Sequence, residues 1–421
     1  MQESEFKITD RGRFWKIAGA GAAFQAGSAA VDSATVVASL VFQLTGSAFA
    51  VGAASAILRL GWLLPQLVVG FLAECSTRRM PFYVFGAYGR AICAGLIALL
   101  LWTGTGLSPV MIATGFLILW TLYAFVSGVV AVPYNDIVGR SIPSGARSRM
   151  LAWRFFGGGI LALGVAVFVR QVLETTQSMF QGYALIFALA SVLMLLSSTL
   201  FVSAGEPIIA AQEPSERRKG LVADFFRNGW VILQGDARFR LFLFSQWLGG
   251  ATLMALPFYV VAASTYGIGA ADVGLLLGAQ TVGSLFSNAF WGRLGDRAGK
   301  LRLLQTVGVL RLFPPIGVLL LLFFADTGVL VGFVLLFIVI GALMSGMTIG
   351  YLGYLMEISP DDRRPAYSAY FNALASPAAL LPLLGAALIE YISINAVFVA
   401  AVVAAAWQLA LLNRISRIQG G

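Results

Sequence analysis

The stretch WGRLGDRAGKLRLL, residues 291–304, places a cluster of charged side chains between two long apolar runs. A similar stretch, VGFLAECSTRRMPF, occupies residues 69–82, which lie 222 positions earlier. The surrounding chain is 421 residues long, 59% hydrophobic and only 11% charged. This composition is typical of a membrane protein. The two charged stretches are therefore expected to be loops between membrane spans, at matching places of an internal repeat.

Apolar runs of about 20 residues are long enough to cross a hydrocarbon core of about 30 Å as helices. The sequence predicts an all-α integral membrane protein with twelve transmembrane helices. The predicted spans are 17–42, 50–73, 82–103, 109–133, 150–169, 181–203, 241–263, 273–292, 303–325, 329–355, 368–389 and 393–413.

The net charge of +9 is explained by the location of the basic residues. Most of the 28 Lys and Arg fall in the two termini or in loops on the same side of the predicted membrane, whereas Arg170 lies at the opposite face. The positive-inside rule then places both termini in the cytoplasm. The basic balance thus indicates membrane topology, and we expect no nucleic-acid partner.

Residues 51–74 align with residues 273–296 at a constant offset of 222, and a similar offset sets Asp136 against Glu357. The chain therefore reads as two pseudo-symmetric six-helix halves. We predict an N-terminal bundle over 1–203, a cytoplasmic linker over 204–240 and a C-terminal bundle over 241–421. Duplicated halves are typical of transporters that alternate access to a site near the membrane midplane.

The loop between the eighth and ninth spans reproduces the spacing G-x-L-a-D-r-x-G-r-r at Gly292, Asp296, Arg297, Gly299 and Lys300. The earlier copy matches at Gly70, Leu72, Glu74, Arg78 and Arg79. Motif, position and span number resemble the major facilitator superfamily (MFS) of secondary transporters over essentially the whole chain.

The resemblance implies that these loop residues form a latch, which is made in one facing state and broken in the other. Gly292 is expected to let a helix end approach its neighbour, and Gly299 to permit a tight turn. For the basic residues, a role in topology alone is equally open. The acids Glu74 and Asp296 favour the latch, because topology does not require them.

Asp32 is the one carboxylate deep inside a predicted span, where it shares a face with Gln25. By helical rise, Asp32 and Arg59 lie at a similar depth of roughly 14 to 15 Å from the outer face. Two readings are open: Asp32 carries a proton, or the two residues form a permanent ion pair that fixes the first span to the second.

Arg90 and Arg311 occupy corresponding spans, which suggests an anion site, although snorkelling or pairing with another helix is favoured. Polar residues at helical spacing mark further spans and fit either a cavity lining or interhelical hydrogen bonds. The cavity candidates among them are Tyr123, Gln280, Asn288 and Asn372.

The sequence contains no His, and it shows neither a P-loop nor a nucleophile motif. We predict that the protein is not an enzyme and needs no metal or cofactor. The expected function is MFS transport of a small solute, with anions among the candidates, by proton-coupled export or exchange in the inner cell membrane, with the protein a monomer in the lipid bilayer. The alternatives are a passive facilitator and a non-transporting assembly factor or receptor on the same scaffold.

Overall fold

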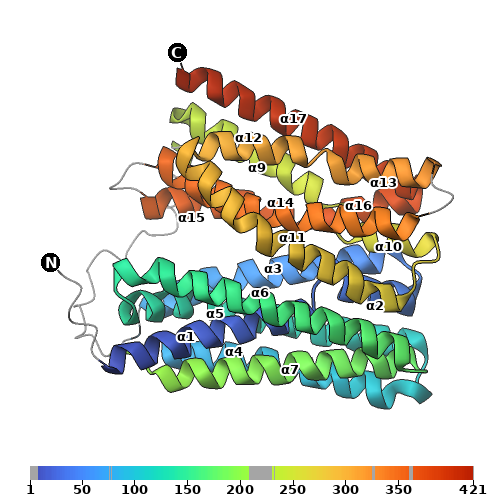
Figure 1. Ribbon diagram of the computed structural model, residues 1–421. Coiled ribbons are helices and arrows are strands. Elements are labelled where there is room, and N and C mark those ends of the chain that lie inside the picture. The colour runs from blue at the N-terminus through green and yellow to red at the C-terminus, as the bar shows by residue number, and fades with distance from the viewer. Residues whose placement is uncertain are drawn as a thin grey trace. The chain divides into compact units, whose positions relative to one another are not determined.

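The computed structural model describes residues 8–74, 76, 78–207, 230–231, 233–324, 328–359 and 364–420. All regular elements in these ranges are helices (Figure 1). The chain divides into two compact units. The first contains Met1–Gln212 and Ile268–Gly278, and the second contains Glu213–Gly267 and Ala279–Gly421.

In the first unit, long helices follow one another through short connections. They are α1 (Ile8–Ala30), α2 (Val36–Thr45), α3 (Ala48–Glu74), α4 (Met80–Thr103), the short η1 (Gly104–Gly106), α5 (Pro109–Ser141), α6 (Ser144–Thr175) and α7 (Met179–Ala204).

The later part of the chain has more interruptions. Its helices are α9 (Ala237–Leu253), α10 (Phe258–Thr265), α11 (Ala270–Arg297), α12 (Lys300–Leu310), α13 (Phe313–Phe324), α14 (Val329–Ile358), α15 (Arg364–Ala375), η2 (Ser376–Leu380), α16 (Leu381–Tyr391) and α17 (Ile394–Gly420). α11 begins in the first unit and continues into the second.

Eleven helical segments of the described residues are long and apolar enough to cross a membrane, and α2 adds a shorter apolar helix. The prediction of an all-α membrane protein with twelve spans is confirmed. Most of the predicted linker, 204–240, lies outside the described residues.

Several predicted spans are broken where the sequence suggested one continuous helix. The first span is divided between α1 and α2, and the seventh between α9 and α10. Pro257 directly precedes α10 and has no backbone N–H for a helical hydrogen bond. The two breaks lie at corresponding places of the repeat, and α3 and α11 begin 222 positions apart.

Within the first unit, α1 packs against α6 and α7, while α4 packs against α5 and α7 (Figure 1). α3 packs against α5, and the buried indole of Trp120 on α5 donates to the carbonyl of Ala54 on α3 at 3.0 Å. In the second unit α17 contacts α9 and α12, and α14 contacts α12 and α13. Trp291, at the beginning of the charged stretch 291–304, is buried there, and its indole N–H donates to the carbonyl of Ala342 on α14 at 2.8 Å.

Candidate functional site

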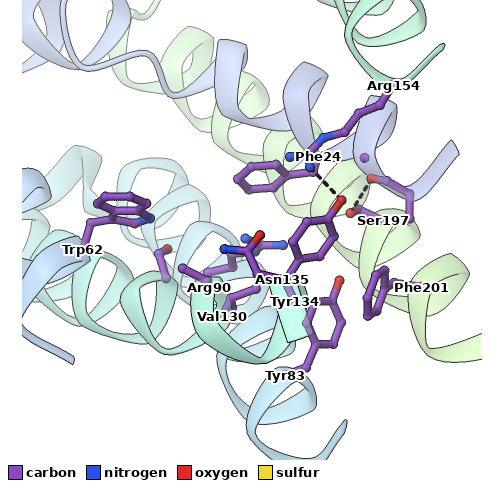
Figure 2. A pocket seen from close by; sticks show the side chains of 14 residues that line it. Phe24, Trp62, Tyr83, Arg90, Val130, Tyr134, Asn135, Arg154, Ser197 and Phe201 are labelled. Atoms are coloured by element: carbon purple, nitrogen blue, oxygen red, sulfur yellow. Dashed lines mark hydrogen bonds between the residues drawn. The ribbon is translucent and has the colours of Figure 1, made fainter. Parts of the chain in front are cut away.

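The first unit contains a cavity of about 200 Å³ between its helices. We call it the arginine cavity, because two arginines reach it and no Asp or Glu is among the residues that line it. Side chains from α1, α3, α4, α5, α6 and α7 surround it (Figure 2). The lining residues are Ala20, Gly21, Phe24, Trp62, Tyr83, Arg90, Ser127, Val130, Ala131, Tyr134, Asn135, Arg154, Ser197 and Phe201.

Arg90 on α4 supplies the more deeply buried charge, because only 4% of its surface is exposed. Its guanidinium carbon lies 4.1 Å from the ring centre of Phe24 on α1, which is a cation–π distance. Its Nε is buried, and the described residues offer it no hydrogen-bond acceptor. Arg90 therefore does not snorkel to an interface, and its charge faces the arginine cavity instead.

Arg154 on α6 supplies the second charge. Its Nη1 donates to the hydroxyl of Tyr134 at 2.6 Å, and its guanidinium carbon lies 5.0 Å from the Tyr134 ring centre. Its Nε is buried and also lacks an acceptor in the described part of the chain. The side chain passes over Gly21 on α1, where a Cβ would lie 2.5 Å from Arg154 Cγ and Cδ. The small residue is what allows Arg154 to cross α1 and reach the cavity.

The remaining walls combine aromatic rings with a few neutral polar groups. Tyr83 stands against Phe201 with ring centres 4.2 Å apart, and Tyr134 lies 5.1 Å from the same ring. Ser197 already donates to the carbonyl of Ala20 at 2.7 Å, so its hydroxyl is occupied. The site can therefore hold a small body between flat rings and present positive charge to it.

Asp32, the predicted proton carrier, lies in the break between α1 and α2. Its Oδ1 accepts hydrogen bonds from Ala34 N at 3.1 Å, from Thr35 N at 2.9 Å and from Thr35 Oγ1 at 2.8 Å. The carboxylate thus holds the two residues that precede α2, close to a helix N-terminus whose dipole favours a negative charge. The role of Asp32 in proton transfer stays a prediction. Its carboxylate also has a structural role, because it orders the connection between α1 and α2.

The other cavity candidates of the first half are placed differently. Arg59 is partly buried on α3, and within the described residues its guanidinium has no recorded hydrogen bond or ion pair. Gln25 packs against Gly158 of α6. Tyr123 is buried, stacks on Trp120 at 4.9 Å between ring centres, and directs its hydroxyl to Met194 Sδ at 3.8 Å. None of these three lines the arginine cavity.

The predicted latch of the first half is an ion network at the beginning of α4. Arg79 Nε donates to Asp136 Oδ2 at 2.8 Å, and Arg140 Nη2 reaches the same oxygen at 2.6 Å. Glu206 accepts hydrogen bonds from the backbone N–H groups of Arg79 and Met80 at 2.8 to 3.0 Å, which caps α4. Asp136 and Glu206 thus hold the latch arginine and its helix.

Three other latch candidates of this half add less. The side chain of Arg78 is exposed. The surroundings of Gly70 and the side chain of Glu74 lie outside the described residues.

The second copy of the loop motif has simpler contacts. Asp296 at the end of α11 pairs with Lys300 at the beginning of α12, with 3.1 Å between Oδ1 and Nζ. Gly299 between them has a φ of +84°, which is the tight turn that the sequence predicted. Arg297 is exposed. The expected close approach at Gly292 is wrong, because a Cβ there would meet no atom within 4 Å.

Residues 242–414 match the family described as the Major Facilitator Superfamily. The match covers the later part of the chain, including the second charged loop at residues 291–304 from its beginning to its end. The resemblance that the loop motif indicated is therefore confirmed. A comparison with curated protein sequences gives no match.

Solved MFS-like structures show the same fold over almost the whole chain. A mutant form of the nucleoside transporter NupG has a TM-score of 0.72 at 12% identity, covering 96% of this chain and 99% of its own. An auto-inhibited peptide transporter of the POT family has a TM-score of 0.69 at 12% identity, with 96% of each chain covered. A bacterial homologue of the iron transporter ferroportin, in an inward-facing state, gives 0.68 at 11% identity, with 96% and 98% covered. Family and fold together support a membrane transporter rather than an enzyme.

The cavity candidates of the second half lie in the second unit. Gln280 and Asn288 lie partly buried on α11, and the side chain of Asn372 is exposed on α15. None of the three is among the cavity residues. Whether they line a solute path stays a prediction.

Arg311, the counterpart of Arg90 in the predicted repeat, has a different environment. It is buried, and its Nη1 donates to Gln408 Oε1 on α17 at 2.5 Å. Gln408 also donates to the carbonyl of Ser245 at 3.0 Å and to the hydroxyl of Tyr351. The adjoining cavity is only about 30 Å³. Arg311 thus joins helices, as the favoured reading of the sequence expected, whereas Arg90 faces open space.

Sequence reasoning missed Arg154 and the aromatic walls. Arg154 lies near the cytoplasmic end of a predicted span, where the positive-inside rule already explains a basic residue. Phe24, Trp62 and Tyr134 look like ordinary apolar residues of a span. One available signal was Gly21, since a small residue one turn before Phe24 permits a bulky neighbour from another helix.

Proposed function

We propose that the protein is a secondary transporter that carries a small solute across the membrane by alternating access, with the arginine cavity as its solute site. The observation that carries the proposal is this cavity with two arginines inside a bundle of membrane-length helices. Side chains this polar are costly among transmembrane helices and are usually retained for function. At about 200 Å³ the cavity is smaller than the roughly 300–1,000 Å³ of drug-sized sites. A small metabolite fits it better than a large drug.

In this proposal the two predicted halves, 1–203 and 241–421, rock against each other about the linker 204–240. The latch residues hold one facing state, and the protein works as a monomer in the inner cell membrane with both termini in the cytoplasm. The proton gradient is the proposed driving force for export or exchange, and no cofactor takes part.

Asp32 is the proposed proton carrier because its carboxylate sits where a helix breaks. While it is ionised, it accepts three hydrogen bonds from Ala34 and Thr35, which directly precede α2. The interaction of an anion with a helix N-terminus stabilises by about 0.3 to 1 kcal/mol, and by up to about 2 kcal/mol when partly buried. Protonation removes the charge and weakens these hydrogen bonds and the attraction to the helix dipole. A bound proton would therefore loosen the joint between α1 and α2.

The structure provides a sharp pair of variants for this step. Asp32→Asn keeps a side-chain oxygen that can accept these hydrogen bonds but has no titratable proton, while Asp32→Ala removes both. We expect Asp32→Asn to fold normally and to lose flux driven by a pH gradient, and Asp32→Ala to lose stability as well. The measurement is solute flux in proteoliposomes with and without a pH gradient, after comparison of metabolites in cells with and without the protein has identified the solute.

Undiminished coupling in Asp32→Asn would remove Asp32 from the mechanism. Wild-type flux that ignores the pH gradient would instead indicate a passive facilitator. A purified protein that moves no solute in liposomes, yet co-purifies stoichiometrically with a partner, would contradict transport and support an assembly factor or receptor.

A further inference from the structure

We infer that the arginine cavity binds a small organic anion with a flat apolar body, held by Arg90 and Arg154. The inference rests on the proposed function in one respect, since it takes this anion to be the transported solute. Binding itself does not depend on transport and can be measured separately.

The first argument is an uncompensated charge. Only 4% of the Arg90 surface is exposed, and a guanidinium stays charged in proteins. Phe24 offers it a cation–π contact, which is weaker than a carboxylate partner. No carboxylate lines the cavity, and Arg90 Nε has no acceptor among the described residues. A buried cation of this kind is stabilised when an anion occupies the adjacent space.

The second argument is that the cavity brings two such cations together. Arg90 and Arg154 both line this one cavity, and like charges that share a site repel each other. Figure 2 shows the two side chains reaching the site from different helices. The Nε of Arg154 also lacks an acceptor in the described part of the chain. An anion between them would relieve this repulsion and accept both N–H groups.

The matching arginine of the second unit shows that burial alone does not explain this arrangement. Arg311 is buried as deeply, and its Nε and Nη2 also lack an acceptor among the described residues. Its Nη1, however, donates to Gln408, and the adjacent cavity of about 30 Å³ has room for little more than a water molecule. The first unit instead leaves a space about 200 Å³ in volume beside its arginine. One buried arginine holds helices together, while the other is available to a ligand.

The walls narrow the chemical class of the anion. Phe24, Tyr83, Tyr134 and Phe201 present flat rings, and Ser127 and Asn135 provide neutral polar groups. Flat rings favour a flat apolar ligand through offset or edge contacts. An aromatic carboxylate or an aryl phosphate has both required parts, a body for the rings and an oxyanion for the guanidinium groups.

The test measures binding to the full-length protein in neutral detergent, through the rise in unfolding temperature with ligand concentration. The probes are benzoate and phenyl phosphate, with benzamide and benzylamine as neutral and cationic analogues of the same size. Short-chain phosphatidylglycerol tests a lipid head group as the source of the anion. Potassium chloride at equal ionic strength controls for salt.

We expect benzoate or phenyl phosphate to stabilise the wild type and the two analogues to have no effect. Arg90→Gln and Arg154→Gln should each weaken the apparent Kd by about tenfold or more, the usual loss when a hydrogen bond to a charged group is removed. Arg90→Lys should retain part of the affinity because it keeps the charge. Arg311→Gln is the matched control, and its ligand-induced shift should equal that of the wild type when each is compared with its own ligand-free state.

Equal stabilisation by benzamide, unchanged anion binding in both glutamine variants, or no shift with either aromatic anion would overturn the inference. Stabilisation by phosphatidylglycerol alone would also overturn it, since the site would then belong to lipid. Anion binding without flux in liposomes would leave the inference standing and contradict the transport proposal. Flux of a neutral solute without anion binding would overturn the inference and leave the transport proposal standing.

Discussion

At the scale of single residues, Gly21 decides whether Arg154 can reach the arginine cavity. Gly21 on α1 has no side chain at the place where the long side chain of Arg154 passes from α6. A Cβ on residue 21 would lie only 2.5 Å from Arg154 Cγ and Cδ. The position of the Arg154 guanidinium in the cavity therefore depends on Gly21, which lies 133 positions earlier in the sequence.

Gly21→Ala is expected to displace Arg154 and to destabilise the protein by about 1 to 3 kcal/mol, the usual range for overpacking. Gly19→Ala is the control on the same helix, where the nearest atom lies 4.0 Å from the added Cβ. It should be neutral or stabilising by up to about 1 kcal/mol, because Ala favours helix more than Gly does. Thermal unfolding in detergent measures both. Equal losses in the two variants would show that helix propensity, not the contact with Arg154, sets the result.

Individual residues also show where sequence reasoning stops. Asp32, Arg90 and Arg311 were identified because charge inside an apolar span is conspicuous. What differs between Arg90 and Arg311 is the partner on another helix and the volume beside them, and neither quantity is present in a local pattern. Arg154 was missed for a related reason, since its position already had an explanation in topology.

At the scale of elements, the N-terminus of α4 is held by the carboxylate of Glu206, a residue that follows the end of α7. Glu206 accepts the backbone N–H groups of Arg79 and Met80, and its side chain is only 10% exposed. The first N–H groups of a helix have no acceptors within the helix. Glu206, which is distant in the sequence, provides the acceptor for two such groups of α4. The end of α7 is thereby tied to the beginning of α4.

Glu206→Gln keeps an acceptor and loses the charge, so we expect it to lower stability by about 1 kcal/mol through the helix dipole and the charge-assisted hydrogen bonds. Glu206→Ala should cost more, because it leaves the two N–H groups without that acceptor. Unfolding in detergent at low and high salt checks the order. If Glu206→Ala were as stable as Glu206→Gln, the carboxylate would not be the cap.

The elements themselves were largely predictable from hydropathy, but their interruptions were not. Residues 31–35 and 254–257 are short segments with apolar runs on both sides, so a window that averages hydropathy sees one span in each case. The breaks are decided by individual hydrogen bonds, such as those to Asp32, and by the missing N–H of Pro257. Such effects act on one residue and disappear in an average over a whole span.

At the scale of the whole molecule, the two copies of the loop motif have different environments. In the first, Arg79 joins Asp136, Arg140 and Glu206 in a partly buried network. In the second, Asp296 is 79% exposed and pairs one turn away with Lys300. Exposed pairs of this kind contribute about 0 to 1 kcal/mol to stability. An effect of Asp296 on transport would therefore not arise from the loss of this pair.

Asp296→Ala is expected to leave unfolding within about 0.5 kcal/mol of the wild type. We also expect it to slow or bias switching between facing states without changing which solute is carried. Glu174→Ala is the matched control, since Glu174 forms a similarly exposed pair with Arg170 at 3.9 Å. Flux rates and the spectrum of solutes in proteoliposomes measure the outcome. An altered spectrum at normal rates would contradict the latch.

The buried guanidinium of Arg90 has a consequence for selectivity. Arginine does not titrate in the physiological range, and the chain contains no His that could. The positive potential of the arginine cavity is therefore the same on an acidic and on a neutral side of the membrane. Any difference in affinity between the two sides must then come from the solute's own ionisation, or from groups outside the cavity. For a weak acid, protonation in the more acidic compartment would itself act as the release step.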